Sequence, residues 1–129
     1  MQQKINRIVV RGKEGKEQLL KGVNEVCDVV GSTMGARGSN NLFETLDGLP
    51  HITKDGVDSL NMMFLPEPVE NMGCEVVKEA CNKQRTEIGD NTTLVCVLTQ
   101  AFFQNSLKEV EKGSNEIEIS QNILKSVEK

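Results

Sequence analysis

Hydrophobic residues recur along the chain at intervals of three and four, which predicts that most of it is helical. The first periodic face begins after Lys16 and should end near Gly31, where glycines interrupt the pattern. Its apolar positions are Leu19, Leu20, Val23, Val26, Cys27 and Val30. Because these positions share one side of a helix, we expect them to face the core.

Three further helical segments follow Pro66 and Pro68, which break the chain. The second of them should begin at Asn91 and run to about Lys112, and Gly113 is a plausible C-cap. The third opens with a pattern that resembles a capping box, Asn115 with Glu118. The expected inward positions are Val69, Met72, Gly73, Val76, Val77 and Ala80 in the first segment, Leu94, Val95, Leu98, Ala101 and Phe102 in the second, and Ile117, Leu124 and Val127 in the third.

Short strands are predicted in the first half of the chain. The β-branched run Ile5–Val10 is typical of a strand, and the run 41–46 could pair with a returning strand at Ile52–Thr53. Asp47–Gly48 between them is a hairpin turn signal. The expected fold is therefore all-α and multihelical, with a small β-hairpin and an N-terminal strand.

Composition fits one domain with an aliphatic core. The chain has 129 residues, four Phe and no Trp or Tyr, so an aromatic-rich β-sandwich is disfavoured. A net charge of −4 argues against nucleic-acid binding. No apolar run approaches the ~20 residues of a membrane span, and no signal peptide is visible, so we expect no membrane partner and a cytoplasmic location.

Four cysteines and one histidine offer little for a zinc site or a disulfide framework. No CxxC pair occurs, and His51 is the only histidine. Cys74 and Cys81 are seven residues apart and should lie along the edge of one helical face, where packing is preferred over metal binding. All four thiols, Cys27 and Cys96 included, are expected to be reduced and to act as small hydrophobic side chains.

Three polar, glycine-containing loops separate the helical segments. They read "TMGARG" (33–38), "TKDG" (53–56) and "GDNTT" (89–93). Each has an ordinary interpretation: a helix C-cap and turn, a type I turn, and an Asp or Asn N-cap. Each also suits an anion, because glycine lets backbone N–H groups approach phosphate and a helix N-terminus attracts it. None matches a Walker-type phosphate loop, and locally both interpretations stay open.

Taken together, the segments "LLKGVN", "TMGARGSN", "ITKDGV", "ENMG", "VVKEA" and "GDNTT…VL.QA" resemble the group I chaperonins, the GroEL type. Their order and spacing match across nearly the whole chain. The resemblance implies that residues 1–129 form the N-terminal segment of an equatorial, ATP-binding domain. It also implies ATP and Mg²⁺ as cofactors and allows for K⁺.

The resemblance assigns site residues one by one. Asp90 corresponds to the family's Mg²⁺-coordinating acid, and Asp55 to an acid tied to hydrolysis. Lys54 corresponds to a lysine that contacts nucleotide. Residues of the phosphate loops correspond to Thr33, Met34, Gly35 and Ala36 in the first loop and to Asn91, Thr92, Thr93 and Leu94 in the third. Three of these depart from the family pattern: Ala36 replaces Pro, Asn91 replaces Gly, and Leu94 replaces a third Thr.

The intermediate and apical segments of the family, and the second half of its equatorial domain, have no counterpart in these 129 residues. We therefore expect the chain to be a segment of a longer ATP-dependent folding chaperonin. Its partners would be further subunits in a double heptameric ring, unfolded clients and a co-chaperonin. Two alternatives remain: a stand-alone structural or interaction protein with a degenerate equatorial fold and no ATPase activity, and a small self-associating nucleotide-binding module.

Overall fold

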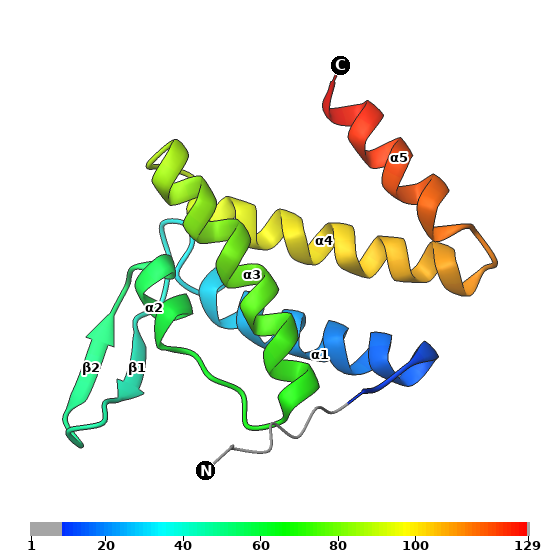
Figure 1. Cartoon of the computed structure of the whole chain (residues 1–129). Coiled ribbons are helices and arrows are strands. Elements are labelled where there is room, and N and C mark those ends of the chain that lie inside the picture. The colour runs from blue at the N-terminus through cyan, green and yellow to red at the C-terminus, as the bar shows by residue number, and fades with distance from the viewer. Residues whose placement is uncertain (1–8, 129) are drawn as a thin grey trace, which may run out of the picture.

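A computed structural model describes residues 9–128 of the chain (Figure 1). Helices dominate the fold, and the only sheet within this range is a two-stranded hairpin, so the multihelical fold with a small hairpin is confirmed. The elements are α1 (Gly12–Gly31), β1 (Asn41–Glu44), β2 (Pro50–Thr53), α2 (Gly56–Met62), α3 (Pro68–Glu87), α4 (Thr92–Glu111) and α5 (Glu116–Val127). The hairpin and α5 lie at opposite sides of the helix bundle.

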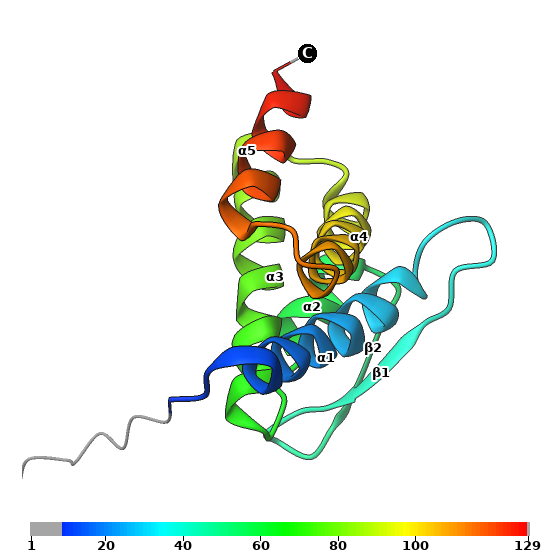
Figure 2. The same cartoon turned by 90° about the vertical axis from the view of Figure 1, so that its right-hand side faces the viewer.

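The core lies between α1, α3 and α4, with α2 closing one end (Figures 1 and 2). It is aliphatic and rich in thiols, as the composition predicts. Its fully buried side chains include Val23, Val26, Val30, Leu60, Val77 and all four cysteines. The cysteines are free in the structure and occupy the space of small hydrophobic residues.

Helices α1 and α3 cross with their backbones almost in contact, and two glycines make this approach possible. A Cβ built on Gly22 of α1 would overlap the carbonyl of Glu70, and one built on Gly73 of α3 would overlap the carbonyl of Leu19. Close packing of this kind leaves no room for even one added methyl group. These two glycines therefore set the distance between the two helices.

The hairpin is antiparallel, and residues 45–49 connect its two strands. Leu42 faces Ile52, and Phe43 faces His51, in an antiparallel pair. Leu42 and Ile52 share the solvent-exposed face, while the Phe43–His51 side is half-buried. His51 Nε2 is 2.8 Å from Asp58 Oδ2, which ties β2 to the first turn of α2.

The predicted inward face of α4 is wrong except at Val95. Leu94, Leu98 and Phe102 are 41%, 46% and 50% exposed, and Ala101 is exposed as well. The helix instead turns Cys96 to the core, with Val95 and Phe103 partly buried beside it. Residues 94–98 are all apolar, so their periodicity does not distinguish between the two faces.

The α3 face is predicted only in part. Val69, Gly73 and Val77 are buried as expected, but Met72 and Val76 are exposed. Cys74 and Cys81, expected at the edge of the face, are fully buried. The helix is therefore rotated so that Cys74 and Cys81, and not Met72 and Val76, lie in the core.

The C-terminal helix α5 packs loosely. Asn115 caps it by accepting a hydrogen bond from Ile117 N, which confirms the N-cap but not the bond from Glu118 that a capping box adds. No residue of α5 is buried, however, and its expected stripe is exposed at Ile117, Leu124 and Val127. An ion pair between Lys16 and Glu116 links its first turn to α1.

Two further observations concern the ends and the surface. The strand predicted at Ile5–Val10 lies mostly outside the described residues, and its described part, Val9 and Val10, is not in a strand. Among residues 9–128, no helix is both long enough and apolar enough to cross a bilayer.

Candidate functional site

The three polar loops meet at one end of the bundle, where α1 ends and α2 and α4 begin. The contact point is Gly56, the first residue of α2. A Cβ built there would lie 2.5 Å from Thr93 Oγ1 and 3.1 Å from Thr33 Oγ1. Both hydroxyls thus touch the same glycine, which brings together segments that are 23 and 37 residues away from it in sequence. The sequence placed Gly56 in the second loop but gave no sign of its contact with the two threonines.

The first loop follows α1 and holds its shape through its own backbone. Thr33 is buried, and its Oγ1 donates to Val30 O at 2.7 Å. Gly35 has a φ of +83°, a conformation that glycine adopts without strain. Ser39 N donates to Ser32 O at 2.7 Å and closes the loop. Met34, Gly35 and Ala36 are exposed, so their backbone is open to a ligand.

The second loop places Lys54 and Asp55 between β2 and α2. Asp55 caps α2, because its Oδ1 accepts from Val57 N at 2.8 Å and from Asp58 N at 3.1 Å. Its Oδ2 makes no hydrogen bond within the described part of the chain. Both side chains are exposed. Asp55 therefore has a structural role through one oxygen, and the other is left without a partner among the described residues.

The third loop contradicts the capping interpretation of its polar residues. Asn91 is the N-cap residue of α4 by position, but its side chain accepts no hydrogen bond from the first turn. Asp90 Oδ1 accepts instead from Asn91 N at 2.7 Å. Within residues 9–128, no side chain takes up the N–H groups that the first turn of α4 leaves without an intrahelical partner.

Asn91 has a φ of +62°, the one positive φ of a non-glycine residue among residues 9–128. Asparagine tolerates this left-handed conformation better than other side chains with a Cβ. The backbone at Asn91 therefore has a conformation that glycine would also adopt without strain, and the exposed side chain adds a carboxamide at the surface of the loop.

The donor set of the three loops fits phosphate and Mg²⁺. It comprises two exposed carboxylates, an exposed ammonium, two threonine hydroxyls, and backbone N–H groups at a helix N-terminus. Mg²⁺ is usually held by one or two carboxylates together with phosphate oxygens. Among residues 9–128 no group of three or more His, Cys, Asp or Glu side chains is arranged to hold a metal by itself. Any metal here would need ligands from a phosphate or from water.

Buried thiols support the floor of the site. Cys27 Sγ of α1 lies 3.1 Å from Cys96 Sγ of α4 and donates to Cys96 O at 3.3 Å. Hydrogen bonds to Cys27 and Cys81, together with burial, raise the pKa of the Cys96 thiol. The raised pKa keeps the Cys96 thiol protonated, and Cys27 and Cys96 act as packing groups beneath Thr33 and Thr93.

Comparison with known proteins identifies the family of this chain. A model of the TCP-1/cpn60 chaperonin family matches residues 26–129. The chain belongs to the TCP-1/cpn60 chaperonin family. It is also similar to the mitochondrial chaperonin homolog Hsp-60 of Caenorhabditis elegans, with 36% identity over 117 residues, which is 91% of this chain and 21% of the relative. The chain thus spans about a fifth of the length of that curated relative.

The matched range of this chaperonin-family chain contains all three loops and every predicted site residue from Thr33 to Leu94. It also contains Gly56 and the four cysteines. Most of α1, residues 12–25, lies outside the matched range. The matched range therefore includes every buried core residue except Val23.

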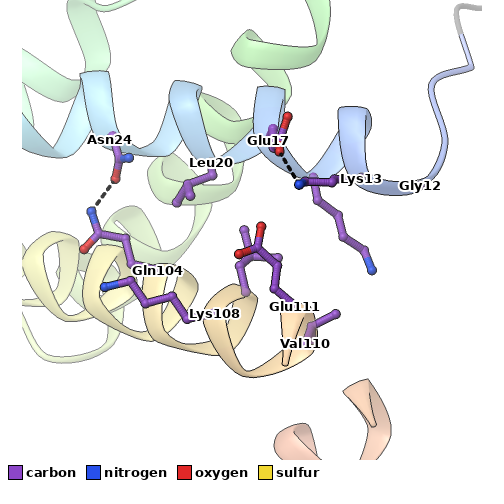
Figure 3. A pocket seen from close by; sticks show the side chains of 11 residues that line it. Gly12, Lys13, Glu17, Leu20, Asn24, Gln104, Lys108, Val110 and Glu111 are labelled. Atoms are coloured by element: carbon purple, nitrogen blue, oxygen red, sulfur yellow. Dashed lines mark hydrogen bonds and ion pairs between the residues drawn. The ribbon is translucent and has the colours of Figure 1, made fainter. Parts of the chain in front are cut away.

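A groove of about 590 Å³ lies elsewhere, between the first half of α1 and the second half of α4 (Figure 3). Asn24 and Gln104 are hydrogen-bonded at one end, and the Lys13–Glu17 pair lies toward the other. Leu20, Leu107 and Val110 contribute apolar surface. None of the predicted site residues lines it, so the groove and the loop site are separate features.

Proposed function

We propose that this chain carries the phosphate- and Mg²⁺-binding half of the nucleotide site of a group I, ATP-dependent protein-folding chaperonin. It would form the N-terminal segment of the equatorial domain. The meeting of Thr33, Gly56 and Thr93 supports the proposal most directly, because it brings the three loops to one place. Family membership, based on residues 26–129, points to the same function.

Each loop has a defined role in this proposal. The exposed backbone of Met34, Gly35 and Ala36 and the first turn of α4 at Thr92 and Thr93 would donate to phosphate oxygens. Lys54 would neutralise phosphate charge, Asp90 would bind the metal, and the free Oδ2 of Asp55 would orient the attacking water. Mg²⁺, when bound, would spread the negative charge that develops on the transferred phosphoryl group.

The departures at Asn91 and Leu94 affect affinity more than geometry. Asn91 keeps the left-handed backbone, so the N–H groups of the first turn stay where a phosphate could reach them. Leu94 is 41% exposed and offers an apolar surface where the family has a hydroxyl. We infer that one phosphate contact is lost and that nucleotide binds more weakly than in a chain with three threonines.

The proposal includes assembly with further subunits, unfolded clients and a co-chaperonin. Strand β1 pairs with β2 of its own chain, and one edge of each strand is unpaired among the described residues. Unpaired edges bind other strands. We propose that this hairpin, and the segment Ile5–Val10, contact a neighbouring subunit in a ring. An assembled structure with both segments in solvent, or paired only within one subunit, would contradict this.

Metal-dependent nucleotide binding tests the site. Titration calorimetry with a non-hydrolysable ATP analogue, with and without Mg²⁺, should show binding that Mg²⁺ strengthens. In Asp90→Ala the strengthening should vanish, while Asp47→Ala, an exposed turn residue outside the site, should behave like the parent chain. Equal Mg²⁺ dependence in Asp90→Ala would overturn the assignment of Asp90. No nucleotide binding in the parent chain would favour the stand-alone interaction protein.

We also propose that these 129 residues alone do not turn over ATP at a useful rate. The loops supply phosphate ligands, but by comparison with the family half of the nucleotide pocket and one catalytic acid lie in other segments. Misplacement by ~1 Å can cost about 100-fold in rate. A steady-state phosphate-release assay should give no activity above the Asp90→Ala background. Metal-dependent turnover that Asp90→Ala abolishes would favour the self-associating nucleotide module.

The cytoplasmic location stays a prediction, to be tested by fractionation of expressing cells.

A further inference from the structure

One side chain of α3, that of Gln84, is hydrogen-bonded to the turn that connects α3 and α4. Gln84 Nε2 donates to the carbonyl oxygen of Asp90 at 3.0 Å. The main-chain oxygen of Gln84 also accepts from Ile88 N at 2.9 Å and from Gly89 N at 3.2 Å. Three links between one residue and the turn make Gln84 its main attachment to the helix.

This attachment matters because the turn has no regular backbone pattern of its own. Gly89 and Asn91, on either side of Asp90, have φ values of +83° and +62°. One turn earlier on the same side of α3, Cys81 Sγ lies 3.5 Å from the carbonyl oxygen of Thr92 and donates to it. Helix α3 thus holds two carbonyls of the loop through side chains three residues apart.

The bond from Gln84 also determines where the Asp90 carboxylate lies. In a trans peptide the C=O and the following N–H point in opposite directions in one plane. With the Asp90 carbonyl turned toward Gln84, the N–H of Asn91 points away from α3. That N–H donates to Asp90 Oδ1 at 2.7 Å. The carboxylate is therefore fixed through a relay from the Gln84 amide, through the Asp90–Asn91 peptide, to Oδ1.

We propose that Gln84 is a positioning residue for the Asp90 carboxylate and hence for the metal of the proposed nucleotide site. The inference rests on that proposed function and adds a residue that neither the motifs nor the resemblance singled out. Only the NH₂ end of the amide can serve a carbonyl acceptor, so the orientation of Gln84 is fixed by its partner. The role depends on a donor at this position.

Three variants of the full chain separate a donor from a packing group. Gln84→Leu keeps the approximate size and removes the donor, and Gln84→Lys keeps a donor at a helix C-terminus, where a cation is also favourable. Gln104→Leu is the matched control, because it loses an inter-helix hydrogen bond of 2.8 Å to Asn24 far from the loop. Circular dichroism and thermal unfolding establish that each variant is folded.

Two measurements report on the loop. Amide hydrogen exchange followed by NMR should show Asn91 exchanging about two- to tenfold faster in Gln84→Leu, because a net hydrogen bond is lost. The parent, Gln84→Lys and Gln104→Leu should agree within about twofold. With Mn²⁺ as the metal probe and an ATP analogue present, the Mn²⁺ concentration that half-broadens the amide signals of residues 89–93 should rise by a similar factor in Gln84→Leu alone.

The outcomes separate the two proposals. An unchanged exchange rate of the Asn91 amide in Gln84→Leu would overturn the positioning role, whatever the Mn²⁺ midpoint is. Faster exchange with an unchanged Mn²⁺ midpoint would show that Gln84 holds the turn but does not position the metal ligand, which also overturns the proposal. If Mn²⁺ broadens no loop signal in the parent chain, the proposed metal site itself is wrong and the metal-positioning role falls with it. If Gln84→Leu and Gln104→Leu changed the Asn91 exchange rate and the Mn²⁺ midpoint equally, the cause would be general destabilisation, and the positioning role of Gln84 would be overturned.

Discussion

The helices pack tightly at one end of this molecule and loosely at the other. At the closed end, formed by the second half of α1, α2, α3 and the first turns of α4, valines, Leu60 and four thiols are fully buried. At the open end, formed by the first half of α1, the second half of α4 and α5, the helices separate around a groove, and α5 buries no residue. The loops of the candidate site lie on the closed end, where a rigid core can hold ligands in place.

Truncating one leucine at each end gives the largest expected contrast. Leu60→Ala should lower the free energy of unfolding by about 2–5 kcal/mol, because Leu60 is fully buried at the closed end. Leu124→Ala at the open end should change it by less than about 0.5 kcal/mol, because that side chain is 62% exposed. Urea unfolding followed by circular dichroism measures both. Similar losses would show that α5 packs more tightly than the structure indicates.

Adding a methyl group where α1 crosses α3 tests the boundary of the closed end. In Gly22→Ala the new Cβ meets the carbonyl of Glu70, so α1 and α3 must separate, and we expect a loss of about 1–3 kcal/mol. Gly31→Ala in the same helix is the control, since its Cβ would meet only Val97 Cγ2 at 3.9 Å. It should be neutral or slightly stabilising. Equal stability of the two variants would mean that the crossing is not tight.

The left-handed residue beside Asp90 should respond to side-chain shape. Asn91→Val places a β-branched residue at a φ of +62° and should cost about 1–2 kcal/mol. Asn91→Gly suits the same backbone and should stay within about 1 kcal/mol of the parent. Thermal unfolding of the two variants side by side gives the difference. A stable Asn91→Val chain would show that the loop adopts another conformation.

Acid should weaken the link between the hairpin and α2, with the smallest expected effect. Hydrogen bonds from His51 and Thr53 lower the pKa of Asp58 below its ordinary value of 3.8. A lowered carboxyl pKa stabilises the fold above the ordinary value, and this contribution is lost as the pH falls through the lowered one. Melting temperatures from pH 6 to pH 2 should therefore show an advantage of the parent over Asp58→Asn that shrinks below about pH 4. An advantage that persists at pH 2 would contradict the assigned cause.

The sequence predicts the elements better than the faces they bury. The face of α1 is clear because charged residues such as Lys21, Glu25 and Asp28 occupy its other side. Helix α4 carries apolar residues around most of its first turns, so the prediction took Leu94 and Leu98 as inward when Cys96 faces the core. Periodicity cannot rank two apolar faces, because which face is buried depends on what packs against the helix.

The candidate site, too, could be predicted only in part: the loops were predictable, but their arrangement in space was not. The three loops are recognisable from their glycines and from their order, because a resemblance preserves spacing. Their convergence on Gly56 depends on how α1, α2 and α4 pack, which no local pattern contains. The link from Gln84 to Asp90 is also invisible in sequence, since it requires left-handed residues at Gly89 and Asn91 to turn the chain back toward α3.

The rate at which the buried thiols react reports how often the helices of this chain separate. All four cysteines are inaccessible in the folded state, so an alkylating reagent can modify them only when the surrounding helices separate. Mass spectrometry after timed pulses would count one, two, three or four added groups and so read out how many thiols open together. Cys96 contacts both Cys27 and Cys81, so these three thiols should be modified as a set. Cys74, close to Met63 at the start of the α2–α3 connection, should follow its own rate.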